Sequence, residues 1–194
     1  MGDNKVKRIC VNGMLVAVYI AIGIFKLDLG FAKITFASLP VILASLMYGP
    51  LDAVIVALLG EFVAQISFSG YGLMPTTPLW MLPPAIRGLL VGLVAYLYRR
   101  KGEHLEKHYV IYFVTLFSAS ILVSAFTTLL MYLDALINNY SFAGDFFRAA
   151  IRFGSSLLTA LIVGVISLPL KSALNFIYSD EQRRKSKEKE TDQK

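Results

Sequence analysis

The chain has 194 residues, of which 56% are hydrophobic and 16% are charged. Soluble domains carry about a quarter charged residues, so this composition indicates an integral membrane protein and argues against a soluble enzyme or binding domain. The net charge of +6 would suit a nucleic-acid partner, but most Lys and Arg residues gather in three clusters, Lys5–Arg8, Arg99–Lys107 and Arg183–Lys194. These clusters flank apolar segments, as the positive-inside pattern predicts, and we expect no nucleic-acid partner.

Six apolar segments follow one another, and they predict an all-α integral membrane protein, a bundle of six transmembrane helices. They run roughly over Ile9–Phe25, Ile34–Tyr48, Leu51–Phe68, Leu79–Tyr98, Val110–Ile137 and Phe147–Tyr178. Six spans place both termini on one side, and the basic clusters identify that side as cytoplasmic. The predicted organisation is a cytoplasmic N-terminus at 1–8, a membrane domain at 9–178 and a charged, disordered cytoplasmic tail at 179–194.

Proline and glycine indicate where the helices should bend or stop. Pro40 should kink the short second span, and the Gly-Pro pair at 49–50 should make a tight turn before the third. A Pro-Pro pair at 83–84 should make the outer end of the fourth span irregular, because a residue before proline disfavours helix. Irregular backbone at membrane depth is tolerated only against protein or a wet cavity, so we expect Trp80–Arg87 to form a cavity wall.

Two ionisable residues lie where hydrocarbon is expected, Glu61 in the third span and Arg87 in the fourth. A charge in the bilayer costs at least about 2.5–3.5 kcal/mol on insertion scales, so each marks a site or a structural pair. At about 1.5 Å per residue the two residues lie at nearly the same depth. The sequence therefore predicts an ion pair between Glu61 and Arg87 that braces the two spans.

Further polar residues at helical spacing predict a ligand site in the outer half of the bundle. On the sixth span Arg148, Arg152 and Ser155 share one stripe, and arginine binds carboxylates with paired hydrogen bonds. Arg148 could instead extend to the interface, Arg152 could have a structural partner, and the aromatic residues could be interface anchors. The predicted ligand-binding residues are Arg152, Arg148, Arg87, Trp80, Tyr71, Ser124, Thr127 and Ser155.

The first span presents small residues at four-residue intervals, Gly13, Ala17 and Ala21, on one face. Small residues let another helix approach closely, so this face predicts a contact with a partner helix. The alternative is ordinary packing inside the same chain.

The sequence offers little for catalysis. His104 and His108 are four residues apart, but no further His or Cys completes a metal site, and a solvated loop explains them. There is no Walker A sequence, and no serine or cysteine has a plausible histidine partner in the membrane. We therefore expect no enzyme activity, no metal and no cofactor.

The chain resembles the substrate-binding S components of energy-coupling factor (ECF) transporters, the vitamin importers of bacteria and archaea. The resemblance covers about residues 8 to 178 and rests on the six spans, the small-residue face of the first span, and two longer runs. These runs are LPVILASLMYGPLDAVIVALLGEF and YGLMPTTPLWMLPPAIRGLLVG. The second run looks most like pantothenate-type members, with folate-type members next.

The resemblance implies a vitamin-binding subunit in the cell membrane, surrounded by lipid and without catalysis of its own. It also implies a transmembrane coupling subunit and two cytoplasmic ATPase subunits as partners, with Ala17 and Ala21 at the docking face. Pantothenate, a small carboxylate, is the expected ligand, and folate or another water-soluble vitamin is the alternative. A self-sufficient channel or secondary transporter is a further alternative, disfavoured by the apolar inner halves of the last three spans.

Overall fold

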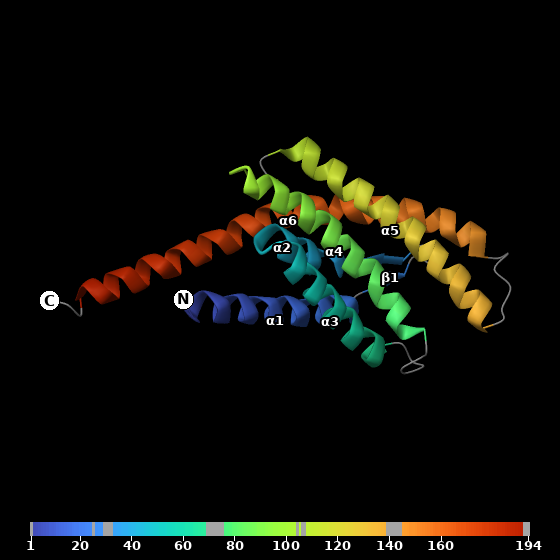
Figure 1. The fold of residues 1–194 in the computed structure, drawn as a ribbon, viewed down its shortest axis with the longest axis horizontal. Helices are drawn as coiled ribbons and strands as arrows, with labels where there is room; N and C mark the ends of the chain where they lie inside the picture. Colours follow the sequence, from blue (N-terminus) through green and yellow to red (C-terminus); the bar gives the residue numbers. More distant parts are fainter. Residues whose placement is uncertain are drawn as a thin grey trace.

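In the computed structural model the described residues form six α-helices and one short antiparallel pair of strands (Figure 1). The structure describes residues 2–24, 26–28, 33–68, 76–103, 105, 108–138 and 145–191. The elements are α1 (Gly2–Ile24), β1 (Lys26–Asp28), β2 (Lys33–Thr35), α2 (Ser38–Met47), α3 (Pro50–Phe68), α4 (Thr77–Arg100), α5 (Tyr109–Asn138) and α6 (Asp145–Thr191).

Five of the helices are long and apolar enough to cross a membrane, and α2 is not. The candidate spans are Val6–Ile24, Pro50–Ser67, Thr77–Arg100, Tyr109–Asn138 and Ala149–Leu174. Many large apolar side chains on these helices are exposed, as lipid contact requires. The all-helical membrane architecture is thus confirmed, whereas the count of six spans stays a prediction because α2 is only about 15 Å long.

The short helix α2 lies at the centre of the fold. Eight of its ten residues are buried, and it contacts α1, α3, α4 and α6. One core cluster joins α2 to α1 and α3 through residues such as Val41, Ala44 and Val56. A second cluster joins α2 to α4, α5 and α6 through Ile42 and Tyr112. A helix hydrophobic on all sides is stable only when it is enclosed, and the longer helices enclose this one.

Figure 1 places the start of α1 and the end of α6 at the same end of the bundle, together with the end of α4 and the start of α5. The basic residues at the start of α1 and at the end of α4 belong to this end. The end of α3, the start of α4, the end of α5 and the start of α6 lie at the opposite end. This arrangement agrees with the predicted alternation of the chain across the membrane, while the cytoplasmic assignment of the termini stays a prediction.

Several local predictions are corrected by the structure. The connection after α1 is not a plain loop, because β1 pairs antiparallel with β2, with Leu27 opposite Ile34. The second span therefore starts at Ser38 rather than Ile34. Pro40 is the third residue of α2, where a backbone N–H would have no helical partner, so proline interrupts nothing there.

Two predicted irregular segments are helical. The Pro-Pro pair lies inside the continuous helix α4, although its two residues cannot donate to the carbonyls of Leu79 and Trp80. Membrane helices tolerate proline where neighbouring groups compensate, and α4 is packed between α2, α3 and α5. The tail expected to be disordered continues α6 as far as Thr191.

The predicted turn between the second and third spans is confirmed. Gly49 has φ of 110°, which favours glycine, and Pro50 begins α3. Helix α4 crosses this turn so closely that a Cβ atom on Gly92 would lie 2.6 Å from the Cα atom of Pro50. Glycine at position 92 is therefore required for the close approach of α4 to the start of α3.

A polar contact fastens α1 to the start of α3. The Arg8 guanidinium forms two hydrogen bonds with the Asp52 carboxylate, including Nε to Oδ1 at 2.7 Å. Asn12 donates to the same Oδ1 at 2.6 Å. The Asp52 side chain is 5% exposed and that of Arg8 48%, so the carboxylate depends on these donors for the hydrogen bonds that water would otherwise provide.

We predict that Arg8→Ala lowers the free energy of unfolding by about 1–3 kcal/mol, because it leaves the buried Asp52 carboxylate with fewer donors. Glu103→Gln is the matched control, since Glu103 pairs with His108 at the exposed surface and such pairs contribute about 0–1 kcal/mol. Thermal unfolding in detergent compares the variants. Equal stability of Arg8→Ala and Glu103→Gln would contradict the role of this contact.

Candidate ligand-binding cavity

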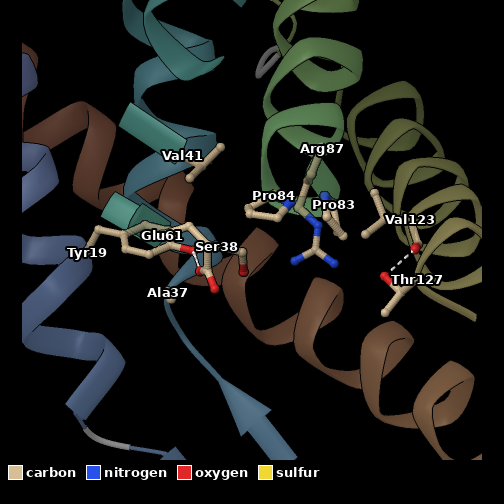
Figure 2. A pocket seen from close by; sticks show the side chains of 10 residues that line it. All are labelled: Tyr19, Ala37, Ser38, Val41, Glu61, Pro83, Pro84, Arg87, Val123 and Thr127. Carbon is tan, nitrogen blue, oxygen red and sulfur yellow. Dashed lines mark hydrogen bonds between the residues drawn. The ribbon is translucent and has the colours of Figure 1, made fainter. Parts of the chain in front are cut away.

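A cavity of about 210 Å³ lies between α1, α2, α3, α4 and α5 (Figure 2). This space is far above the roughly 10–15 Å³ of probe-occupied volume that holds one water. Its walls combine apolar and polar side chains with one acid and one base. The described lining residues are Tyr19, Ala37, Ser38, Val41, Glu61, Pro83, Pro84, Arg87, Val123 and Thr127.

Glu61 forms the acidic wall, and two donors hold its carboxylate. The Tyr19 hydroxyl donates to Oε2 at 2.6 Å, and the Gln65 amide donates to Oε1 at 2.7 Å. Tyr19 can reach across from α1 because a Cβ atom on Gly60 would lie 2.6 Å from its ring. The one-turn spacing of Glu61 and Gln65 brings the amide onto the same helical face as the acid. This wall is therefore a carboxylate that the protein has already oriented.

Arg87 forms the basic wall. Figure 2 shows its guanidinium pointing from α4 into the space between the Tyr19–Glu61 contact and Thr127. Its Nε atom is buried and has no hydrogen-bond partner. An unsatisfied buried donor costs about 1–3 kcal/mol, and more when the group is charged. The side chain is thus prepared to bind an acceptor that enters the cavity.

The predicted ion pair between Glu61 and Arg87 is not formed. No ion pair between described residues joins them, although both line the same cavity. Helical spacing predicts a similar depth for the two residues, but depth does not fix the distance across the bundle. Tyr19 on α1 and Gln65 on α3 donate hydrogen bonds to the Glu61 carboxylate instead.

Two of the predicted ligand-binding residues line the cavity, Arg87 and Thr127. The Thr127 hydroxyl donates to the carbonyl of Val123 one turn earlier, as Figure 2 shows. Ser124 is buried beside them on α5, but its side chain is not part of the lining. The predicted Ser/Thr face of α5 therefore meets the cavity mainly through Thr127.

Three further predicted residues lie elsewhere in the described part of the chain. Arg152 contacts Sδ of Met131 on α5, and the Ser155 hydroxyl donates to the carbonyl of Arg152. Neither residue lines the cavity, and neither does the half-buried Trp80. Tyr71 and the side chain of Arg148 lie outside the described residues. A ligand role for these five residues stays a prediction.

Sequence reasoning missed Tyr19 and Ser38 as lining residues. Tyr19 lies on the first span between the small residues, and that pattern directs attention to the opposite face of the helix. A signal was available, because a carboxylate at membrane depth requires donors and a phenol on a neighbouring span can supply one. Ser38 lies at the start of α2, which the sequence did not delimit correctly.

The small-residue face of α1 is open. Gly13, Ala17 and Ala21 are all exposed, and a Cβ atom on Gly13 would have no neighbour within 4 Å. The alternative of close packing inside the same chain is therefore not observed. The opposite side of the helix carries Leu15 and Tyr19, which are buried.

Together these features define a membrane protein with several spans and an internal polar cavity between its helices. The sequence from residue 7 to 177 matches the family model described as ECF transporter, substrate-specific component. The chain therefore belongs to the family of substrate-specific components of ECF transporters. That family is the substrate-binding part of a transporter and not an enzyme.

Solved structures of this kind have the same fold. The S component of a bacterial ECF transporter aligns with a TM-score of 0.63 at 20% identity, over 89% of this chain and 98% of its own. FolT bound with folic acid aligns with a TM-score of 0.62 at 22% identity, over 87% of this chain and 96% of its own. The S component for biotin from an ECF-type ABC transporter aligns with a TM-score of 0.63 at 14% identity, over 89% of this chain and 94% of its own. No curated protein sequence matches the chain.

We predict that Tyr19 and Glu61 act as one unit in stability. The destabilisations caused by Tyr19→Phe and Glu61→Gln should differ from additivity by about 1.5–3 kcal/mol in a double-mutant cycle, because their hydrogen bond involves a charged group. Tyr19→Phe combined with Asp134→Asn is the control pair, and it should add to within about 0.5 kcal/mol. Additive behaviour of the first pair would contradict the observed contact.

Proposed function

We propose that this chain is the pantothenate-binding S component of an ECF-type importer in a bacterial or archaeal cell membrane. The observation that carries the proposal is the side chain of Arg87, which lines a small cavity and whose buried Nε atom has no hydrogen-bond partner. A ligand carboxylate supplies the missing acceptor, and arginine can bind it with two parallel hydrogen bonds. Thr127 on the neighbouring wall offers a polar contact without adding charge.

The chemistry of the cavity supports a small carboxylate vitamin. Its walls offer the Arg87 guanidinium, the Glu61 carboxylate and the Thr127 hydroxyl beside apolar side chains. Pantothenate is a single short chain with one carboxylate, one amide and two hydroxyls. The structural likeness to FolT extends to the fold, at 22% identity.

The partners follow from the family and from the surface of α1. We propose that Gly13, Ala17 and Ala21 dock a transmembrane coupling subunit, which in turn binds two cytoplasmic ATPase subunits. The exposure of all three small residues supports this assignment, because small residues let two helices approach closely within the membrane.

Arg87→Ala should weaken pantothenate binding by roughly thirtyfold or more, the effect of losing a charged partner worth about 2–5 kcal/mol. Calorimetric titration of the purified protein should show that the parent strongly prefers pantothenate to panthenol, in which the carboxylate is replaced by a hydroxymethyl group. The variant should lose this preference. Arg87→Lys should also bind poorly, because lysine lacks the planar fork.

Arg152→Ala is the matched comparison, because it removes a second arginine that contacts Met131 and does not line the cavity. Its preference for the acid should equal that of the parent. If Arg152→Ala loses the preference and Arg87→Ala keeps it, Arg152 is the anion site and the assignment to Arg87 is wrong.

Ala17→Trp and Ala21→Trp should block assembly, because a large side chain prevents close approach of the partner helix. The coupling subunit and ATPases should no longer co-purify with either variant, while pantothenate titration should remain as in the parent. Val18→Trp places an equally large side chain at an adjoining exposed position. It tests whether a large side chain elsewhere on α1 also blocks assembly. Normal assembly of both alanine variants would refute the docking role.

A further inference from the structure

The cavity has a second polar wall that the anion site does not use. Glu61 lines it opposite Arg87 and contacts Tyr19 (Figure 2). Gln65 also donates to its carboxylate. An ionised carboxylate accepts about four hydrogen bonds, and these two donors use one on each oxygen. The Glu61 carboxylate can therefore accept further hydrogen bonds from a group in the cavity.

The two contacts also determine what this acid can accept. Tyr19 and Gln65 both donate to it, so they hold the carboxylate in one orientation as an acceptor. A group that binds it from the cavity must therefore bring a hydrogen, as a hydroxyl or an N–H does. Arg87 has the opposite requirement, because a guanidinium has donors and no acceptor. The cavity thus presents an acceptor on one wall and a donor on the other.

We infer that Glu61 is a specificity-determining residue that binds a hydroxyl or N–H at the end of the ligand remote from its carboxylate. This inference rests on the proposed function, in which Arg87 holds the carboxylate. Its consequence is a defined substrate class, small monocarboxylates with donor groups at the far end. A ligand with a second carboxylate there would place two negative charges together in a partly desolvated space, and binding is disfavoured.

The competing explanation is that Glu61 only links α3 to α1 through Tyr19. A purely structural residue would change the binding of all ligands by the same factor when it is replaced. A residue that contacts the ligand changes the ratio of affinities between two ligands that differ at the contacted group. This ratio, measured on a single preparation, does not depend on how much of the protein is folded.

The test is to titrate pantothenate and its bis-O-methyl ether, in which both hydroxyl hydrogens are replaced, into the parent and Glu61→Gln. The parent should prefer pantothenate by about ten- to hundredfold, as expected for hydrogen bonds to a charged group. In Glu61→Gln the preference should fall by about fivefold or more, since a neutral hydrogen bond contributes less. An unchanged preference in the variant would overturn the inference.

A ligand analogue that Glu61→Gln binds more tightly than the parent does gives a sharper test than a loss of preference. An analogue whose primary hydroxyl is oxidised to a carboxylate should bind the parent poorly, and Glu61→Gln should bind it better than the parent does. Destabilisation of the fold cannot produce this improvement. Asp134→Asn is the control, because it removes an acid that contacts Asn138 on α5 and does not line the cavity, and it should bind the analogue as the parent does.

Tyr19→Phe provides a second variant that keeps the charge. It removes the donor to Oε2, so the preference for pantothenate over its ether should change while rejection of the dicarboxylate persists. If Tyr19→Phe and Glu61→Gln both scale every affinity equally, Glu61 is structural only. If the parent binds no pantothenate at all, the proposed function fails and this inference fails with it, an outcome distinct from an unchanged ratio.

Discussion

Two opposite charges border one cavity in this protein, and neither neutralises the other. Charges within a membrane-spanning bundle are costly unless they are paired or solvated, so their arrangement constrains everything around them. Glu61 meets this constraint through donors from α1 and from its own helix, whereas the Nε atom of Arg87 has no partner. This asymmetry supports the proposal that Arg87 binds a ligand and is not half of a structural ion pair.

Helix α2 packs against both α3 and α4, the two helices that carry these charges. This helix is too short to cross a membrane but is buried on almost all sides, and it contributes Ser38 and Val41 to the cavity. Its last turn is held by Arg99, which donates to the carbonyl of Leu46 at 2.7 Å, and Ser45 donates to the carbonyl of Gly88 on α4. The cavity is therefore built from the ends and faces of five elements that are fixed elsewhere in the core, as preorganised sites require.

The sequence predicted the parts of this structure that depend on local patterns. Apolar length predicted five helices that are long enough to cross a membrane, and the Gly-Pro pair at 49–50 predicted the turn. The position of Glu61 and Arg87 within apolar segments identified them as unusual. The sequence did not predict which residues meet across the bundle, because one-dimensional spacing fixes depth and face but not the separation between helices. For this one reason Tyr19 was missed, and the predicted Glu61–Arg87 ion pair is not formed in the structure. The continuous helix through Pro83 and Pro84 shows tertiary packing overriding a local preference.

We propose that the space between Arg87 and Glu61 holds a small monocarboxylate. Mass spectrometry can identify the small molecules released from protein purified out of its native membrane. We expect the parent to release pantothenate, and Arg87→Ala, purified in the same way, to release none. Release of folate, or of the same molecule in equal amount from the parent and from Arg87→Ala, would contradict it.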